Sequence, residues 1–90
     1  MREIQKTTVF TMDLQSLTSI IREEIWKIVC LLQENLFDRR LNIRKLEGYK
    51  NVWRISFKKS YRLIYTFDKA NIYLLRVRHR KDIYRKGINL

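Results

Sequence analysis

Apolar and polar residues alternate over three short stretches in the second half of the chain. The stretches are Val52–Lys58, Tyr61–Phe67 and Ile72–His79, and only short polar segments separate them. A period of two residues is typical of β-strands that bury one face and expose the other. Short polar connections favour antiparallel hairpins. The pattern therefore predicts a three-stranded antiparallel meander.

The alternation also predicts where the side chains of the first two strands point. One face collects Trp53, Ile55, Phe57, Tyr61, Leu63, Tyr65 and Phe67. If helices cover this apolar face, the opposite face carries Arg54 and Arg62. Because an apolar face must be covered to be stable, we expect the arginine-bearing face to remain open. That open face is the predicted functional site.

The third strand adds more cations to the open face. Strict alternation places Tyr73, Leu75 and Val77 on one face and Ile72, Leu74, Arg76 and Arg78 on the other. Arg80 lies two residues beyond Arg78, so it points the same way if the strand continues. We therefore expect arginines from all three strands to converge.

Before the meander, the period changes to steps of three and four residues between Met12 and Leu36. The apolar positions are Leu14, Leu17, Ile21, Ile25, Ile28, Leu32 and Leu36. Such spacing is typical of an amphipathic helix. The steps slip near Ile21, and Thr18 or Ser19 just before it suits a helix N-cap. We therefore predict two antiparallel helices, over about 12–17 and 19–36, with one long helix as the alternative.

The two remaining segments carry weaker signals. Glu3–Phe10 carries residues that favour a strand, and it is predicted to form an edge strand: Ile4, Thr7, Thr8, Val9 and Phe10. Phe37–Lys50 is polar and basic, and it is predicted to be a loop that ends in a tight turn at Gly48. The loop cations are candidates for contact with nucleic acid or with a protein partner: Arg39, Arg40, Arg44 and Lys45.

Composition narrows the class of partner. The chain has 90 residues, which suits one domain over 1–90, and its formal net charge is +11. So large an excess of positive charge opposes folding and points to a polyanionic partner, with nucleic acid ahead of an anionic membrane or an acidic protein. Cys30 is the only cysteine, so neither a disulfide framework nor a cysteine metal site is expected. The N-terminus lacks an apolar signal segment, and we expect a soluble cytoplasmic protein.

Three motifs carry a resemblance to a known family. The run WRISF, then YRLIY, then HRKDIYR, preceded by LEGYKNVWRI, resembles the RelE/ParE superfamily of bacterial and archaeal toxins over roughly Leu46–Arg85. The resemblance implies a compact α+β domain of βααβββ order, in which two N-terminal helices pack on one face of an antiparallel meander. It also implies the toxin of a type II toxin–antitoxin module. The expected partner is a small, acidic, partly helical antitoxin that forms a hetero-oligomer with the toxin, and no cofactor is expected.

The resemblance implies an activity as well. RelE-type members cut messenger RNA in the ribosomal decoding site without a metal ion, which inhibits translation. The expected function is therefore that of a ribosome-dependent messenger-RNA endoribonuclease, or mRNA interferase, with the ribosome and messenger RNA as partners. ParE-type members share the fold and act on DNA gyrase, and some members show no toxicity. A gyrase inhibitor and a non-catalytic nucleic-acid binder remain alternatives.

The resemblance assigns roles to individual positions. Arg62 matches the arginine that stabilises the transition state, Arg80 matches a second arginine, and Tyr84 matches the C-terminal tyrosine that shapes the site. Arg54 stands where a basic residue occurs in RelE-type toxins. Ser56 departs from the pattern, because some members carry there a second basic residue that assists proton abstraction.

Elementary chemistry supports such a site. RNA cleavage through the 2′-hydroxyl needs in-line geometry, charge stabilisation at phosphorus and proton transfer, but no protein nucleophile. Arginine forks can hold two phosphate oxygens at once. His79 is the only histidine, and imidazole is well suited to proton transfer near neutral pH. Tyr84 or Tyr61 can stack on a splayed base. Further cations are predicted to contact RNA, ribosome or antitoxin: Lys58, Lys59, Arg76, Arg78 and Lys81, with Arg39, Arg40, Arg44 and Lys45.

Overall fold

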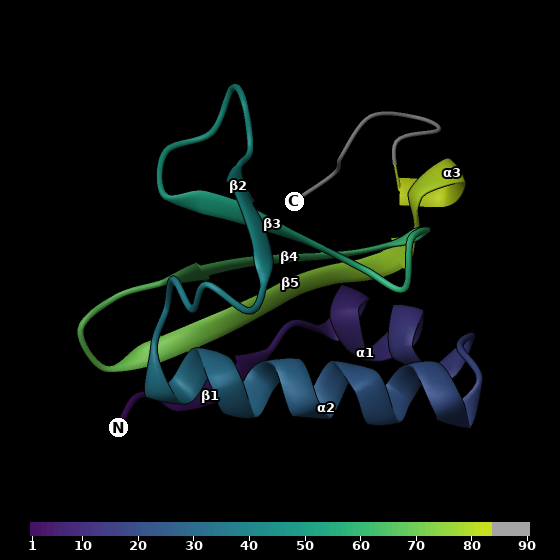
Figure 1. The fold of residues 1–90 in the computed structure, drawn as a ribbon, viewed down its shortest axis with the longest axis horizontal. Coiled ribbons are helices and arrows are strands. Elements are labelled where there is room, and N and C mark those ends of the chain that lie inside the picture. Colours follow the sequence, from purple (N-terminus) through teal and green to yellow (C-terminus); the bar gives the residue numbers. More distant parts are fainter. Residues whose placement is uncertain (84–90) are drawn as a thin grey trace.

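One strand, two helices, four strands and a short helix follow one another along residues 1–83, which are the residues that this computed structural model describes (Figure 1). The elements are β1 (Glu3–Lys6), α1 (Thr8–Gln15), α2 (Ser19–Glu34), β2 (Asn42–Lys45), β3 (Val52–Phe57), β4 (Tyr61–Phe67), β5 (Asn71–His79) and α3 (Arg80–Ile83). The predicted α+β class, the two N-terminal helices and the three-stranded meander are confirmed.

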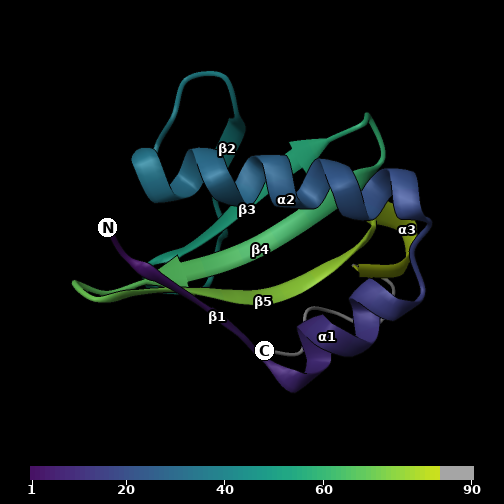
Figure 2. The same cartoon turned by 90° about the horizontal axis from the view of Figure 1, so that it is seen from below.

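All five strands belong to one sheet of order β1-β5-β4-β3-β2. The last four strands pair antiparallel, whereas β1 runs parallel to β5 at the edge of the sheet. The first and last strands of the described chain are therefore neighbours. This long-range pairing brings α1, which follows β1 directly, against the outer side of β5 (Figure 2).

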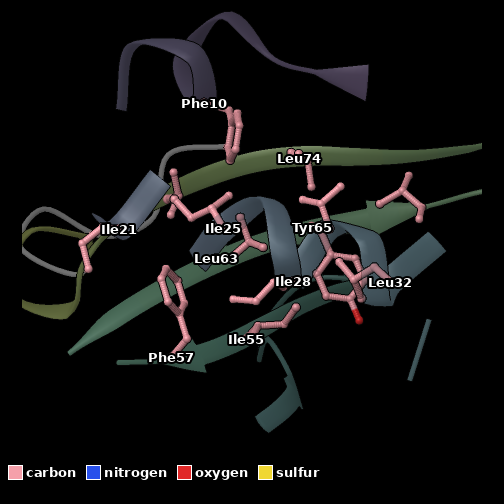
Figure 3. Close-up of a cluster of buried hydrophobic side chains, with 13 residues drawn as sticks. Phe10, Ile21, Ile25, Ile28, Leu32, Ile55, Phe57, Leu63, Tyr65 and Leu74 are labelled. Carbon is pink, nitrogen blue, oxygen red and sulfur yellow. The ribbon is translucent and has the colours of Figure 1, made fainter. Parts of the chain in front are cut away.

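The main core lies between α2 and one face of the sheet (Figure 2). The amphipathic stripe of α2 buries Ile21, Ile25, Ile28, Val29 and Leu32. Across from it lie buried residues of the sheet: Ile55, Phe57, Leu63, Tyr65, Ile72, Leu74 and Val77. Figure 3 shows Tyr65 among the aliphatic side chains. Its hydroxyl donates a hydrogen bond of 2.8 Å to the carbonyl oxygen of Leu36, so the buried phenol is satisfied.

The predicted N-terminal strand is too long. The strand ends at Lys6, and the predicted strand residues Thr8, Val9 and Phe10 belong to α1. The side chain of Thr7 accepts a hydrogen bond of 3.0 Å from the backbone N–H of Phe10, which is an N-cap that starts the helix. The first helix therefore spans Thr8–Gln15 instead of 12–17. Thr18 caps α2 in the same way, as its sequence position predicts.

The predicted loop Phe37–Lys50 contains a strand. β2 pairs antiparallel with β3, with Asn42 opposite Ser56 and Arg44 opposite Arg54. Four residues are too short a run for alternation to be recognised, and pairing with β3 supplies the backbone hydrogen bonds that stabilise the strand. Gly48 has a φ of 86°, a conformation that favours glycine, and it lies in the connection between these two strands.

The strict alternation predicted for β5 is wrong in its first half. Ile64 pairs with Arg76, but the next residue, Tyr65, pairs with Leu74, so Leu75 is the extra residue of a bulge. The bulge turns Ile72 and Leu74 toward the helices and Leu75 away from them. Beyond the bulge the predicted side of the strand is confirmed. Arg76 pairs with Ile64 and therefore projects from the same face of the sheet.

The face of the sheet away from α2 is only partly open. A second apolar cluster covers part of it, formed by the buried residues Leu46, Val52, Ile64 and Ile83 with Leu75 beside them. Ile83 comes from α3, a turn of helix that sequence periodicity did not predict, and its side chain is 2% exposed. None of the helices within residues 1–83 is long and apolar enough to cross a lipid bilayer.

Candidate functional site

Five arginines share the face of the sheet that points away from α2, and we call their side chains the arginine face: Arg44, Arg54, Arg62, Arg76 and Arg78. Residues that pair directly across antiparallel strands project from the same side of a sheet. One row across the strands is Arg44, Arg54, Ile64 and Arg76, and the next is Asn42, Ser56, Arg62 and Arg78. The predicted convergence of Arg54, Arg62, Arg76 and Arg78 is therefore present, and β2 adds Arg44.

Two of these arginines are direct cross-strand partners. Arg62 of β4 lies directly opposite Arg78 of β5. The Cβ atoms of such pairs are about 4.5–5.5 Å apart, and like charges at that separation destabilise a sheet. A bound anion relieves this repulsion, so the pair is chemically suited to a phosphate group.

Arg62 retains donor capacity that the protein does not use. Its Nη1 donates hydrogen bonds to the carbonyl oxygens of Tyr61, at 2.9 Å, and of Lys59, at 3.4 Å. Among the described residues its buried Nε has no hydrogen-bond partner. A buried donor without a partner costs free energy, and a turn of the side chain toward a bound acceptor would remove that cost.

Asp13 of α1 reaches the arginine face from beside β5. Its carboxylate accepts from Arg76 Nε at 2.8 Å, from Arg76 Nη2 at 3.2 Å and from the backbone N–H of Val77 at 3.2 Å. It also lies 3.8 Å from Arg78 Nε. The side chains of Arg76 and Asp13 are only 13% and 7% exposed. Arg76, which was predicted to contact RNA or a partner, is thus mostly enclosed, whereas Arg78 is 39% exposed.

No sequence signal pointed to Asp13. A single acidic residue in a short amphipathic helix usually faces solvent, and its partner lies 63 residues away in the sequence. The sequence offered only an indirect indication. Any arginine of β5 that is buried needs an acidic residue nearby to balance its charge.

The turn between β3 and β4 adds exposed cations at the Arg62 end of the face. Lys58 and Lys59 have φ values of 48° and 65°, the left-handed region that L-residues rarely adopt. The backbone N–H of Arg80 donates to the carbonyl oxygen of Ser60 at 2.6 Å, which ties the start of α3 to this turn. Since β5 ends at His79, Arg80 does not extend the strand as the prediction required. It is exposed on α3 beside the turn, as is Lys81.

His79 does not share the arginine face. It pairs with Tyr61 and, two residues beyond Val77, lies on the helix side of the sheet. The two rings meet edge to face with their centroids 5.4 Å apart. The backbone N–H of Lys81 donates to Nδ1 of His79 at 3.2 Å. Tyr84 lies outside the described residues.

The cations around β2 differ in availability. Arg40 donates to both carboxylate oxygens of Asp38, at 3.0 and 2.7 Å. These hydrogen bonds lower the pKa of Asp38 from 3.8 to about 2. Arg40 is therefore already paired within the protein. Arg39, Arg44 and Lys45 are exposed.

Comparison with known proteins identifies the family. A family model described as the ParE toxin of the type II toxin–antitoxin system, parDE, matches residues 2–84. Toxin RelE3 of Methanocaldococcus jannaschii is 36% identical over 77 residues, which cover 83% of this chain and 86% of that protein.

Solved structures agree with the family assignment. The RelB–RelE antitoxin–toxin complex from Methanococcus jannaschii contains a chain that is 30% identical, with a TM-score of 0.77 over 90% of this chain and 95% of that one. The E. coli DinJ–YafQ toxin–antitoxin complex contains a chain with a TM-score of 0.79 at 15% identity, over 92% of this chain and 97% of that one, which shows a shared fold. The family match and the curated relative together establish that this chain belongs to the RelE/ParE superfamily of toxins of type II toxin–antitoxin systems.

Proposed function

We propose that this toxin is a metal-independent endoribonuclease that cuts messenger RNA on the ribosome and so inhibits translation. The observation that carries the proposal is the direct pairing of Arg62 with Arg78 on the arginine face, with Arg54 in the next row. These guanidinium groups would hold the phosphate at the cleaved bond. The ribosome would supply the messenger RNA in a fixed conformation.

The arginines fit the electrostatic requirement of this reaction. Attack of the 2′-hydroxyl on the neighbouring phosphate adds negative charge to the phosphate oxygens in the transition state. Fixed donors aimed at developing charge are usually the largest catalytic contribution that a protein makes. Arg62, which lies directly opposite Arg78, is the donor that we assign to the transition state.

We assign proton transfer to none of the residues next to Arg62. Ser56 lies opposite Arg62, so a hydroxyl stands where some relatives carry a base. His79 lies on the other side of the sheet, and we assign it no contact with the phosphate that Arg62 holds. The proposal therefore places charge stabilisation on the described arginines and keeps Tyr84 and Arg80 in the roles that the family resemblance implies.

We also propose that the chain binds an acidic antitoxin. The relatives from M. jannaschii and E. coli were crystallised as antitoxin–toxin complexes. A net charge of +11 favours a partner of opposite charge, and charge complementarity speeds association. Such a partner would neutralise the arginine face while the toxin is held inactive.

The direct test is cleavage of a short messenger RNA on purified ribosomes, mapped by primer extension. Arg62→Ala should lower the cleavage rate about 100- to 1,000-fold, the usual effect of losing a transition-state donor. Lys27→Ala, which removes one exposed charge from α2 on the other side of the sheet, is the matched control and should leave the rate unchanged. Intact messenger RNA alongside growth arrest by the unaltered toxin would refute the proposal.

A gyrase inhibitor is the second candidate, because the matching family model is that of ParE toxins. Such a protein binds its target without cutting RNA. A supercoiling assay with purified gyrase separates the two candidates. Inhibition at micromolar toxin, with messenger RNA left intact on ribosomes, would establish the second candidate in place of the first.

A further inference from the structure

A separate hollow lies where the helix side and the arginine face meet at the end of β5. We call it the end pocket. It has a volume of about 390 Å³ and is lined by Ser16, Leu17, Tyr61, Arg78, His79 and Asp82. Sites for small molecules in proteins range from about 300 to 1,000 Å³, so the end pocket is large enough for one nucleobase. Apart from Arg78, the residues that line it take no part in the catalytic steps proposed above.

The walls of the end pocket are aromatic on one side. The rings of Tyr61 and His79 are partly exposed and meet at an interplanar angle of 77°. His79 Nδ1 accepts a hydrogen bond from the backbone of Lys81, which fixes the orientation of the imidazole. Because the two rings are nearly perpendicular, a planar base can stack on one of them while its edge meets the other.

Polar groups on the remaining walls supply both hydrogen-bond donors and acceptors. Asp82 contributes a carboxylate, which accepts two hydrogen bonds side by side. Arg78 contributes a guanidinium, which donates two. Guanine matches this set, because it presents neighbouring N1–H and N2–H donors on one edge and neighbouring O6 and N7 acceptors on another.

Arg78 links the end pocket to the arginine face. It lines the pocket and also lies directly opposite Arg62. Asp13, which lies 3.8 Å from Arg78 Nε, restrains the same guanidinium. A nucleotide whose phosphate rests between Arg62 and Arg78 therefore has its base, or that of its neighbour, beside the end pocket.

We propose that the end pocket binds a nucleobase of the RNA, with guanine preferred. The base stacks on Tyr61 with its edge beside His79, Asp82 accepts from its Watson–Crick edge, and Arg78 contacts either its acceptors or the adjoining phosphate. This assignment rests on the proposed function, since it names the part of the RNA that lies next to the phosphate. It makes the pocket a determinant of which sequence is cut.

The only histidine of the chain provides a direct probe. The imidazole resonances of His79 in an NMR spectrum need no assignment, and the free toxin can be titrated with GMP, AMP, CMP and UMP in the absence of ribosomes. GMP should shift these resonances saturably and with the highest affinity. Inorganic phosphate, the control for the charge on Arg78, should shift them less and without competing fully with GMP.

Two variants test the named contacts. Asp82→Asn should lower the affinity for GMP about tenfold or more, to the level of the other nucleotides, because it removes the paired acceptor. Tyr61→Leu should weaken all four nucleotides alike, because it removes the stacking surface. Backbone amide spectra that match the unaltered toxin show that each variant is folded. Lys27→Ala, which removes an exposed charge of α2 outside the pocket, should bind as the unaltered toxin does.

The proposal is overturned if no nucleotide shifts His79, if inorganic phosphate alone reproduces the shift, or if the four nucleotides bind equally and Asp82→Asn changes nothing. These results differ from failure of the proposed function. A toxin that binds GMP but leaves messenger RNA intact refutes ribosome-dependent cleavage alone, whereas one that cuts messenger RNA without binding nucleotide refutes the end pocket alone.

Discussion

The two faces of the sheet are built from alternate residues of the same strands, yet they are opposite in chemistry. The face toward α2 buries Ile55, Leu63 and Tyr65 completely, and its partners are apolar. The arginine face sets Arg62 against Arg78, an arrangement that opposes folding. Stability therefore comes mainly from one face, which allows the other to carry charge for an anionic ligand.

The arginine face is itself divided. Toward its middle, Arg76 is enclosed by Asp13, and the cluster around Ile64 and Ile83 is apolar. Toward the turn between β3 and β4, the cations are more accessible, and Arg62 retains unused donor capacity. Only some of the arginines on this face are therefore available to a ligand, and the Arg62 end is the part suited to a phosphate.

Neighbouring residues of β4 provide the sharpest test of the division between the faces. Leu63→Ala should lower the free energy of unfolding by about 2–5 kcal/mol, because Leu63 is 0% exposed and the cavity cannot close fully. Arg62→Ala, one residue earlier on the opposite face, should change it by less than about 1 kcal/mol, since it removes both contacts and repulsion. Urea unfolding of both variants gives the two values.

Ile20→Ala is the matched control for the apolar substitution. Ile20 lies on α2 and is 68% exposed, so its loss should change the free energy of unfolding by less than about 0.5 kcal/mol. If Arg62→Ala proved as destabilising as Leu63→Ala, the assignment of stability to one face and binding to the other would be wrong.

Asp13 tests whether the two faces are connected. Its helix buries Phe10 in the main core while its carboxylate holds Arg76. Asp13→Ala should lower the free energy of unfolding by about 2–3 kcal/mol, below the value for a fully buried pair because Arg76 can turn to solvent. Asp13→Asn, which keeps an acceptor for the Val77 N–H, should cost less.

A double-mutant cycle of Asp13→Ala with Arg76→Ala measures the coupling directly. The two side chains should show a coupling free energy of about 1 kcal/mol or more. The single Arg76→Ala variant should be less destabilised than Asp13→Ala, because the Asp13 carboxylate keeps its hydrogen bond from the Val77 N–H. Additive effects would mean that α1 is held by its apolar contacts alone.

The smallest expected effect concerns the turn between β3 and β4. Lys58→Gly and Lys59→Gly should each raise the free energy of unfolding by about 0.5–1 kcal/mol, because glycine adopts the left-handed conformation without strain. The same variants should bind ribosomes more weakly and with a shallower dependence on salt, since each removes one cation. Thermal melts and ribosome pelleting at several salt concentrations measure the two effects.

Lys69→Gly is the control for the turn, because Lys69 lies in the turn between β4 and β5 and does not have a positive φ. It should not be stabilising. If the variants at Lys58 and Lys59 were more stable and bound ribosomes as tightly as the unaltered toxin, the accessible end of the arginine face would not extend to this turn.

Local pattern predicted the elements whose signal is repeated several times. β3 and β4 alternate without interruption, so the side on which Arg54 and Arg62 lie follows from counting. The amphipathic pattern of α2 and its N-cap at Thr18 could also be predicted from the sequence. By contrast, β2 is four residues long and α3 is a single turn, and neither is long enough to show a period.

Period and charge are local properties of the chain, so the class of the fold, the meander and the arginine-bearing face could be predicted from them. How that face is used depends on contacts between distant segments. The bulge at Leu75, the approach of Asp13 to Arg76 and the position of His79 across from Tyr61 all depend on pairings between distant segments. Such pairings are set by packing and long-range hydrogen bonds, which leave no period in the sequence.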